Sequence, residues 1–279
     1  MSGSGVNNWR VEMMAIVLKA GCTLLVIGGL STASLAGLSE SGPMVGLHED
    51  AIMTASDGSV GGWLGWDVDF EGSVLIAGAP RQDGGHAVIG YLNEWGALVS
   101  TDELAGSDTV DGDAFGWSVA IGGLGESGGV AFVGAPVWAR DDAPQSSGAV
   151  YVFEGGSSGG PTEVGMITPA SGPLSRAFGN SLDFDGTRLA VGAFFESMEE
   201  DDAGELISAH GAVYVYDIGP NGLPTAEQRV VCEIPLQSQS LGFDVSLDGD
   251  QMAVGALKDS TVAYQAGAVY HFERQSSND

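Results

Sequence analysis

Short apolar runs alternate with glycine-rich turns through most of this chain, and the pattern repeats four times. Each unit opens with an aromatic residue or leucine followed by glycine, at 64–65, 115–116, 178–179 and 241–242. A second apolar run ends in Gly-Ala, and after a loop a third run reads Gly-Ala-Val-Tyr or a close variant. Short runs rich in valine and aromatic residues and bounded by glycine predict β-strands. The periods of 51, 63 and 63 residues (65 to 116, 116 to 179 and 179 to 242) are typical of a repeat protein.

The spacing within each unit separates a constant part from a variable one. From the first glycine to the glycine of Gly-Ala there are 13 residues in three units (65 to 78, 179 to 192, 242 to 255) and 18 in the second (116 to 134). Turns such as Asp185-Gly186 and Asp248-Gly249 are the pairs that tight hairpins prefer. The loop after Gly-Ala varies from 7 residues (78 to 85) to 19 (192 to 211). Because loops on a constant scaffold usually carry function, we expect any ligand on this loop face.

A fourth apolar segment lies between the units, and it predicts a four-stranded sheet for each. The candidates are Ala51–Ala55, Leu98–Leu104, Val164–Thr168 and Val230–Pro235. The pattern predicts an all-β fold, a β-propeller of four blades. Since the last unit stops after its third strand, we expect Ala51–Ala55 to supply the fourth strand and close the ring. The alternative is an open arc of four blades that a second chain completes.

The motifs resemble those of the FG-GAP repeat family, which forms the blades of the integrin α-chain head and of many bacterial surface proteins. The second unit is the most similar, with Phe115-Gly116 and Gly134-Ala135-Pro136. Other units have leucine for phenylalanine, or Phe194 and Leu257 where the family has proline. The resemblance covers about residues 47–273. It implies a propeller that acts in binding or at a surface, and relatives with other roles keep the ligand open.

Residues 1–36 are predicted to be a signal peptide. Arg10 and Lys19 precede the apolar run 20–30, and Ser34 and Ala36 fit a cleavage site after Ala36. The alternative is an uncleaved anchor, although this stretch is marginal for a membrane span. We therefore divide the chain into the signal peptide (1–36), a linker (37–46), the propeller (47–273) and a disordered tail (274–279). The protein is expected to be secreted, periplasmic or on the cell surface, without a stable membrane span once mature, and Cys232 is expected to be a buried thiol.

The charge is strongly negative and narrows the range of partners. The chain has 37 acidic and 9 basic side chains, for a formal net charge of −28. Such a charge repels nucleic acid, and it suits cations, basic partners or simple solubility. We expect an extracellular protein or a glycan as partner.

Acidic residues crowd most densely in the third-unit loop, which makes it the candidate metal site. Glu199, Glu200, Asp201 and Asp202 are consecutive there. Carboxylates at this density suit Ca²⁺, and the alternative is a solvated loop that binds no ion. The resemblance also implies calcium loops between the first two strands of a repeat, but Asp183–Gly186 and Asp248–Asp250 are too short to surround a cation.

Among the aromatic side chains, we select Trp138 as the candidate ligand contact, because it follows Gly-Ala-Pro in a variable loop. In contrast, Trp63, Trp66, Trp117 and Phe243 recur at the first strand of their units and are expected to pack in the core; the alternative is a platform on which a sugar stacks.

No residue set predicts catalysis, since no pair of carboxylates stands apart from the many others. The sequence therefore predicts a non-catalytic binding or adhesion module that presents variable acidic loops. The alternatives are an extracellular hydrolase that uses loop carboxylates and a purely structural envelope protein.

Overall fold

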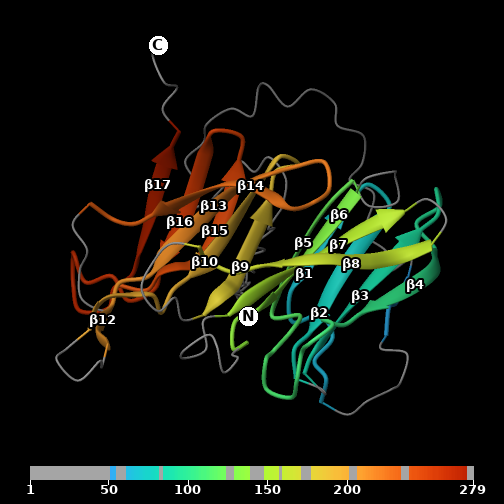
Figure 1. The fold of residues 1–279 in the computed structure, drawn as a ribbon, viewed down its shortest axis with the longest axis horizontal. Coiled ribbons are helices and arrows are strands. Elements are labelled where there is room, and N and C mark those ends of the chain that lie inside the picture. Colours follow the sequence, from blue (N-terminus) through green and yellow to red (C-terminus); the bar gives the residue numbers. More distant parts are fainter. Residues whose placement is uncertain are drawn as a thin grey trace, which may run out of the picture. The chain divides into compact units, whose positions relative to one another are not determined.

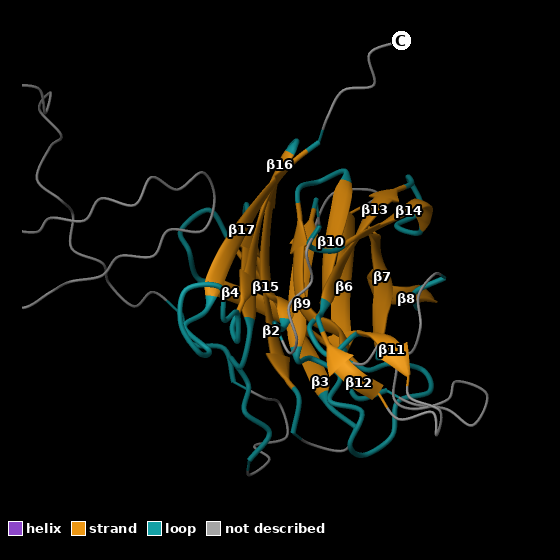
Figure 2. Ribbon diagram, turned by 90° about the vertical axis from the view of Figure 1, so that its left-hand side faces the viewer, coloured by secondary structure: helices purple, strands orange, loops and turns teal. Residues whose placement is uncertain are grey.

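Each sequence unit forms one antiparallel sheet, and the four sheets are the blades of a β-propeller (Figure 1). The computed structural model describes residues 51–54, 61–81, 84–123, 129–138, 148–156, 159–170, 177–200, 206–233 and 239–274, all within the unit His48–Asp279. The predicted signal peptide and linker lie outside the described residues. Strands, turns and coil make up the described part of the chain, which contains no helix (Figure 2).

The first two blades have four strands in chain order. Blade one consists of β1 (Val68–Glu71), β2 (Val74–Ala79), β3 (His86–Leu92) and β4 (Leu98–Leu104). Blade two consists of β5 (Ser118–Gly122), β6 (Gly129–Ala135), β7 (Ala149–Gly156) and β8 (Gly159–Ile167).

The third blade carries an inserted hairpin, and the fourth blade has three strands. Blade three consists of β9 (Phe178–Phe184), β10 (Arg188–Ala193), β13 (Ala212–Ile218) and β14 (Pro224–Val230), with the hairpin β11 (Ser197–Glu200) and β12 (Leu206–Ala209) in its long loop. Blade four consists of β15 (Leu241–Asp248), β16 (Gln251–Ala256) and β17 (Ala268–Glu273).

The predicted strands and their order are confirmed, with two differences in the fourth segments. The fourth strand of blade three ends at Val230, so the prediction of Val230–Pro235 was placed too late. The strand expected at Ala51–Ala55 is not found in residues 51–54, which are coil. Met53 lies instead beside Gly90 in blade one, because the small glycine leaves room there for its sulfur. The fourth blade thus has no fourth strand from this segment among the described residues.

The hydrophobic core consists of three layers, each between two consecutive blades. Ile76 and Ile89 of blade one pack with Val119 and Val133 of blade two in the first layer. The second and third layers repeat this arrangement between blades two and three and between blades three and four. Each pair of consecutive blades therefore buries apolar side chains of both sheets between them.

Glycines set how closely consecutive blades approach. A Cβ added at Gly78, Gly134 or Gly192, the glycine of Gly-Ala, would lie 1.8, 2.2 or 2.1 Å from the carbonyl oxygen of the first glycine of the next blade. The glycine before the third strand also bridges the next blade, in the parallel pairs Gly85–Phe115, Gly148–Phe178 and Gly211–Leu241. The residue before each Phe-Gly or Leu-Gly has a left-handed backbone: Trp63, Ala114, Ala177 and Ser240. The bend is thus the same in all four units, although L-residues adopt it at a cost.

The close approach gives a matched test of the interface. Gly192→Ala should lower the free energy of unfolding by about 1–3 kcal/mol, because the new methyl group would overlap the Gly242 carbonyl. Gly255 has the same place in blade four, but the nearest atom to an added Cβ is Asp244 N at 3.6 Å. Gly255→Ala should therefore change stability by less than about 0.5 kcal/mol in the same urea titration. Equal losses at the two positions would show that blade contact does not require glycine.

Candidate binding surface

Carboxylates on the first strand of a blade bind the backbone of the next blade. Asp67 and Asp69 accept hydrogen bonds from the N–H groups of Val119 (2.8 Å) and Ile121 (2.9 Å). The same contact joins blades three and four, where Asp183 accepts from Leu247 N at 2.6 Å. The first strand is the edge of its sheet, so its outward N–H groups have no strand partner. These acidic residues therefore act as hydrogen-bond acceptors for a sheet edge.

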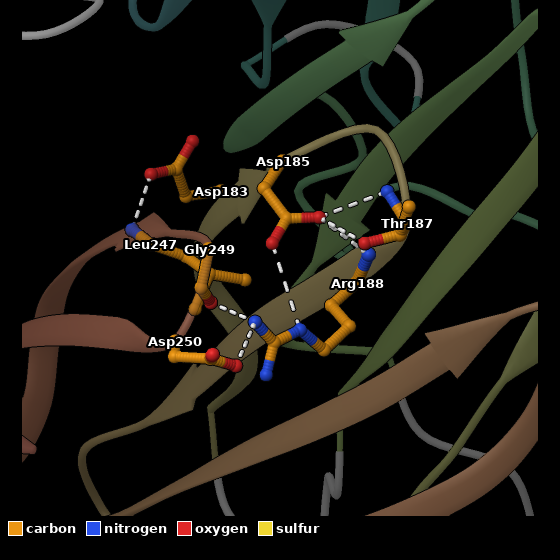
Figure 3. Close-up of polar contacts among 7 residues, drawn as sticks. All are labelled: Asp183, Asp185, Thr187, Arg188, Leu247, Gly249 and Asp250. Carbon is orange, nitrogen blue, oxygen red and sulfur yellow. Dashed lines mark hydrogen bonds and ion pairs between the residues drawn. The ribbon is translucent and has the colours of Figure 1, made fainter. Parts of the chain in front are cut away.

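The turn Asp183–Gly186 of blade three resembles a shortened calcium loop, and the side chain of Arg188 pairs with its Asp185 (Figure 3). Asp185 accepts from the backbone N–H of Thr187 (2.8 Å) and of Arg188 (2.7 Å), and its other oxygen lies 3.6 Å from Arg188 Nε. The Arg188 guanidinium continues to blade four, where it donates to the Gly249 carbonyl and lies 3.4 Å from an oxygen of Asp250. The positive charge at this turn thus comes from a side chain that also joins two blades.

The candidate calcium site in the third-unit loop is only partly described. Glu199 and Glu200 lie in β11, and Asp201 and Asp202 lie outside the described residues. Within the described ranges, no group of three or more His, Cys, Asp or Glu side chains is arranged to hold a metal ion. Calcium at this loop stays a prediction.

In blades three and four, the loop after Gly-Ala places a buried acidic side chain in hydrogen-bond contact with the tyrosine of the third strand. Glu196 is fully buried, accepts from Tyr214 Oη at 2.6 Å and pairs with Arg229, whose Nε lies 2.5 Å away. Asp259 is 1% exposed and accepts from Tyr270 Oη at 2.7 Å. A buried carboxylate costs free energy unless it is hydrogen-bonded, so each cluster holds its loop in one conformation.

Trp138 occupies the corresponding loop position in blade two, third after the alanine of Gly-Ala. Its N–H donates to Ala135 O and its carbonyl accepts from Gly148 N, as Glu196 and Asp259 do with their own loops. The indole is 6% exposed and lies in the core between blades one and two, with Nε1 3.4 Å from Asp108. Asp108 also accepts from Tyr151 Oη. Trp138 thus has a packing role, and ligand contact by it stays a prediction.

The Asp259 cluster shifts the titration of both partners. Burial alone would raise the pKa of Asp259, but hydrogen bonds from Thr261, Tyr270 and Gln239 lower it to about 2. Burial and the bond to Asp259 raise the pKa of Tyr270 to about 12. Burial also raises the pKa of the buried Cys232 thiol, as expected for a structural cysteine. Asp259 is therefore charged and Tyr270 neutral through the neutral range, so the hydrogen bond between them is present there.

The aromatic residues of the first strands form a row that is partly exposed, which corrects the expectation of core packing. Trp66 and Phe243 are 44% and 40% exposed. The Trp66 ring lies 4.7 Å from that of Trp117, whose Nε1 donates to Asn180; Asn180 in turn donates to the Phe243 carbonyl. Each side chain in the row contacts the corresponding residue of a neighbouring blade. The row has open ends at the first and fourth blades because Trp66 has no preceding blade and Phe243 no following one among these contacts.

We call the apolar surface at the open end of blade one the leading face: Trp63, Trp66, Val68 and Phe70. Val68 and Phe70 are 54% and 57% exposed, whereas the corresponding Val119 and Ile121 of blade two are 1% and 4% exposed. Trp63 stacks on Trp66, and the Arg81 guanidinium lies 4.4 Å from its ring centroid. An exposed cluster of large apolar side chains at positions that are buried in other blades is a candidate binding surface.

Sequence reasoning missed the leading face because one repeat position has two environments. The pattern identifies Val68 as the counterpart of Val119, and a preceding blade buries Val119. The available signal was the position of Trp66 in the first of the four units of the sequence.

Comparison with known proteins agrees with the geometry. A family model described as FG-GAP repeat matches residues 47–90, 99–153 and 236–272, which include the strands of blade one, most of blade two and blade four. Blade three lies outside the matched stretches, but its sheet order and its glycine contacts make it a fourth copy. No curated protein matches the chain.

The calcium prediction is tested by differential scanning calorimetry with calcium or with a chelator. A bound ion should raise Tm, because binding to the folded state stabilises it by mass action. The rise should disappear when Glu199, Glu200, Asp201 and Asp202 are all changed to their amides. An identical Tm with calcium and with chelator in the unaltered chain would exclude the site.

The buried acid predicts a pH dependence. Because the folded pKa of Asp259 lies at about 2, below the ordinary value of about 3.9, its contribution is present above about pH 4 and is lost as the pH falls toward 2. Stability measured by urea unfolding should fall less steeply across this range in Asp259→Asn than in the unaltered chain. Asp111→Asn, at an exposed turn, controls for the loss of one charge. Parallel profiles for all three proteins would contradict the assignment.

Proposed function

The chain is a β-propeller of FG-GAP repeats, and we propose that it is a non-catalytic binding module of the cell exterior that takes a protein partner on its leading face. The observation that carries this proposal is the exposure of Val68 and Phe70 on β1 together with Trp66 in the turn that precedes it. Buried apolar area is the main source of affinity in protein association, and aromatic side chains are enriched at interface centres.

A protein partner fits this surface better than a glycan. Sugar sites combine an aromatic platform with several polar groups that fix the hydroxyls, whereas Val68 and Phe70 extend the tryptophans into an apolar strip. The strip lies on β1, the edge strand of its sheet. A second polypeptide offers both apolar side chains and backbone or carboxylate acceptors for such an edge.

Five of the described carboxylates have structural partners, which supports binding over hydrolysis. Asp67, Asp69 and Asp183 bind the backbone of a neighbouring blade, and Glu196 and Asp259 are buried against tyrosines. A general acid and base must face a substrate with a space between them, and these five are committed to the scaffold.

The location at the cell exterior is supported by the predicted signal peptide at residues 1–36 and by the surface roles of many FG-GAP proteins. The described residues include no helix with the length and apolar character to cross a membrane. The variable loop face, with the acidic loop at 199–202, is a second surface that such a module would present to its surroundings.

The proposal is tested by binding with and without the leading face. The purified chain and a Trp66→Ser/Phe70→Ser variant are compared for capture of proteins from the extracellular fraction of the source cells and on a glycan array. Both side chains are exposed, so the variant should keep its unfolding midpoint. We expect the variant to capture at least tenfold less of the partner protein than the unaltered chain does. Trp95→Ser, at a 78% exposed turn in the same blade, is the control and should leave capture unchanged. Equal capture by all three proteins, or binding to glycans alone, would contradict the proposal.

A further inference from the structure

We propose that the partner of the leading face is a second copy of this chain, bound head to tail through the open side of its fourth blade. The inference rests on the proposed function, since it names the partner of the same surface. It follows from an interface that the chain forms three times within itself and for which both halves remain exposed at its ends.

The internal interface has three recurring contacts. The glycine of Gly-Ala lies against the first glycine of the next blade. The glycine before the third strand pairs with the Phe or Leu that precedes the first glycine of the next blade. Side chains of the first strand bind the backbone of the next first strand: Asp67 to Val119 N, Asp183 to Leu247 N, and Ser118 to the Gly179 carbonyl at 2.7 Å.

Blade four presents the half of this interface that supplies the acceptor side chains, which we call the trailing face: Asp244, Ser246, Asp248, Gly255 and Gly267. The three polar residues alternate along β15 as Asp67, Asp69 and Glu71 do along β1, and all three are exposed. At Gly255 an added Cβ would have Asp244 N as its nearest neighbour, at 3.6 Å, whereas the counterpart at Gly192 would meet a carbonyl of the next blade at 2.1 Å. At Gly267 the nearest atom is its own blade's Leu257 O at 3.3 Å, against 2.1 Å to Leu241 O at Gly211.

Blade one presents the other half, which supplies the backbone N–H donors. An added Cβ at Gly65 would meet nothing within 4 Å, whereas at the corresponding Gly116 it would meet the carbonyl of His86 in the preceding blade at 2.1 Å. The register of the internal interface assigns the contacts: Asp244 would accept from Val68 N and Asp248 from Gly72 N. Ser246 would face Phe70 N, which in the single chain donates to Asp69 Oδ1 at 2.8 Å. The two faces of one chain do not make these contacts with each other in the described residues, and both are thus available to another copy.

Apolar surface and charge match across the two faces. Blade four exposes Val269 on β17 (77%), at the position where Val150 and Val213 are fully buried by the next blade. Docking would cover it together with Val68 and Phe70. Arg81 provides positive charge beside Trp63 on the leading face, opposite the carboxylates of the trailing face. Met53 already lies beside Gly90, so the contact falls mainly on the inner strands β1 and β15.

The geometry requires a heterologous interface, in which each copy uses a different face. Such contacts close into a ring or continue as a filament. With a leading and a trailing face at the two ends of a four-blade series, two copies can join through two identical seams.

The experiment measures association of the purified full-length chain by sedimentation velocity across the micromolar range. The leading-face variant is Val68→Asp/Phe70→Asp, and the trailing-face variant is Gly255→Leu. Both change exposed or open positions, so their unfolding midpoints should stay those of the unaltered chain. We expect the unaltered chain to associate and each variant alone to associate at least tenfold more weakly. Val99→Asp, at an exposed site on β4, should associate like the unaltered chain.

Mixing the two variants is the decisive step. One keeps an intact trailing face and the other an intact leading face, so an equimolar mixture should form a heterodimer through a single seam. A mixture that stays monomeric, or an unaltered chain that is monomeric throughout the range, would overturn the inference. If the chain is monomeric while Trp66→Ser/Phe70→Ser still loses capture of another extracellular protein, the second copy is excluded as partner and the proposed binding function stands.

Discussion

The close approach of two backbones between consecutive blades is the constraint on which this structure depends. Carbonyl oxygens of one blade occupy the space that a Cβ of the preceding blade would fill, at Gly78, Gly134 and Gly192. This explains why glycine occupies these positions of the repeat motif and why the distance between the two motif glycines is 13 residues in three units. The hairpin between them must place both glycines in register with the next blade. The loop that follows has no such partner, and its length varies.

The acidity of the chain has a structural component that follows from the same packing. A sheet that ends in an edge strand leaves N–H groups without partners, and the preceding blade supplies acceptors from Asp67, Asp69 and Asp183. Two further carboxylates, Glu196 and Asp259, fix the loops in which they lie by accepting hydrogen bonds from tyrosines. Two of the aspartates in the shortened calcium-like turns, Asp185 and Asp250, are paired with Arg188. A high density of acid in a repeat of this kind therefore indicates hydrogen-bond acceptors before it indicates a metal site.

Much of the fold was predictable from the sequence, because strand position depends on local pattern and on the spacing of glycines. The environment of a side chain was less predictable, because it depends on which blade stands beside it. Trp138 sits in a variable loop and yet packs in the core, since its loop position is the one at which blades three and four bury an acid. Trp66 occupies a repeat position and yet is exposed, since none of the described blades packs on that side of it. Neither distinction can be made from one unit alone. The segment around Met53 differs for a related reason: Met53 lies beside Gly90 of blade one, where the missing side chain leaves space for its sulfur.

In a repeat protein, each terminal unit has one surface that no neighbouring unit covers, and the character of these two surfaces bears on function. Solenoids commonly end in units whose outer surface is polar, which keeps them soluble. Blade four follows this rule in part, with Gln251 and His271 exposed on the strands that would meet a further blade. Blade one does not, since Val68 and Phe70 on its edge strand and Trp66 just before it are exposed and apolar. An uncovered apolar edge strand promotes aggregation. The dense negative charge opposes random association of copies, and it leaves specific association to surfaces where acceptors meet N–H groups and Arg81. In a closed pair, the second seam forms within an already assembled complex and avoids the entropic cost of bringing two chains together, so the two seams support each other.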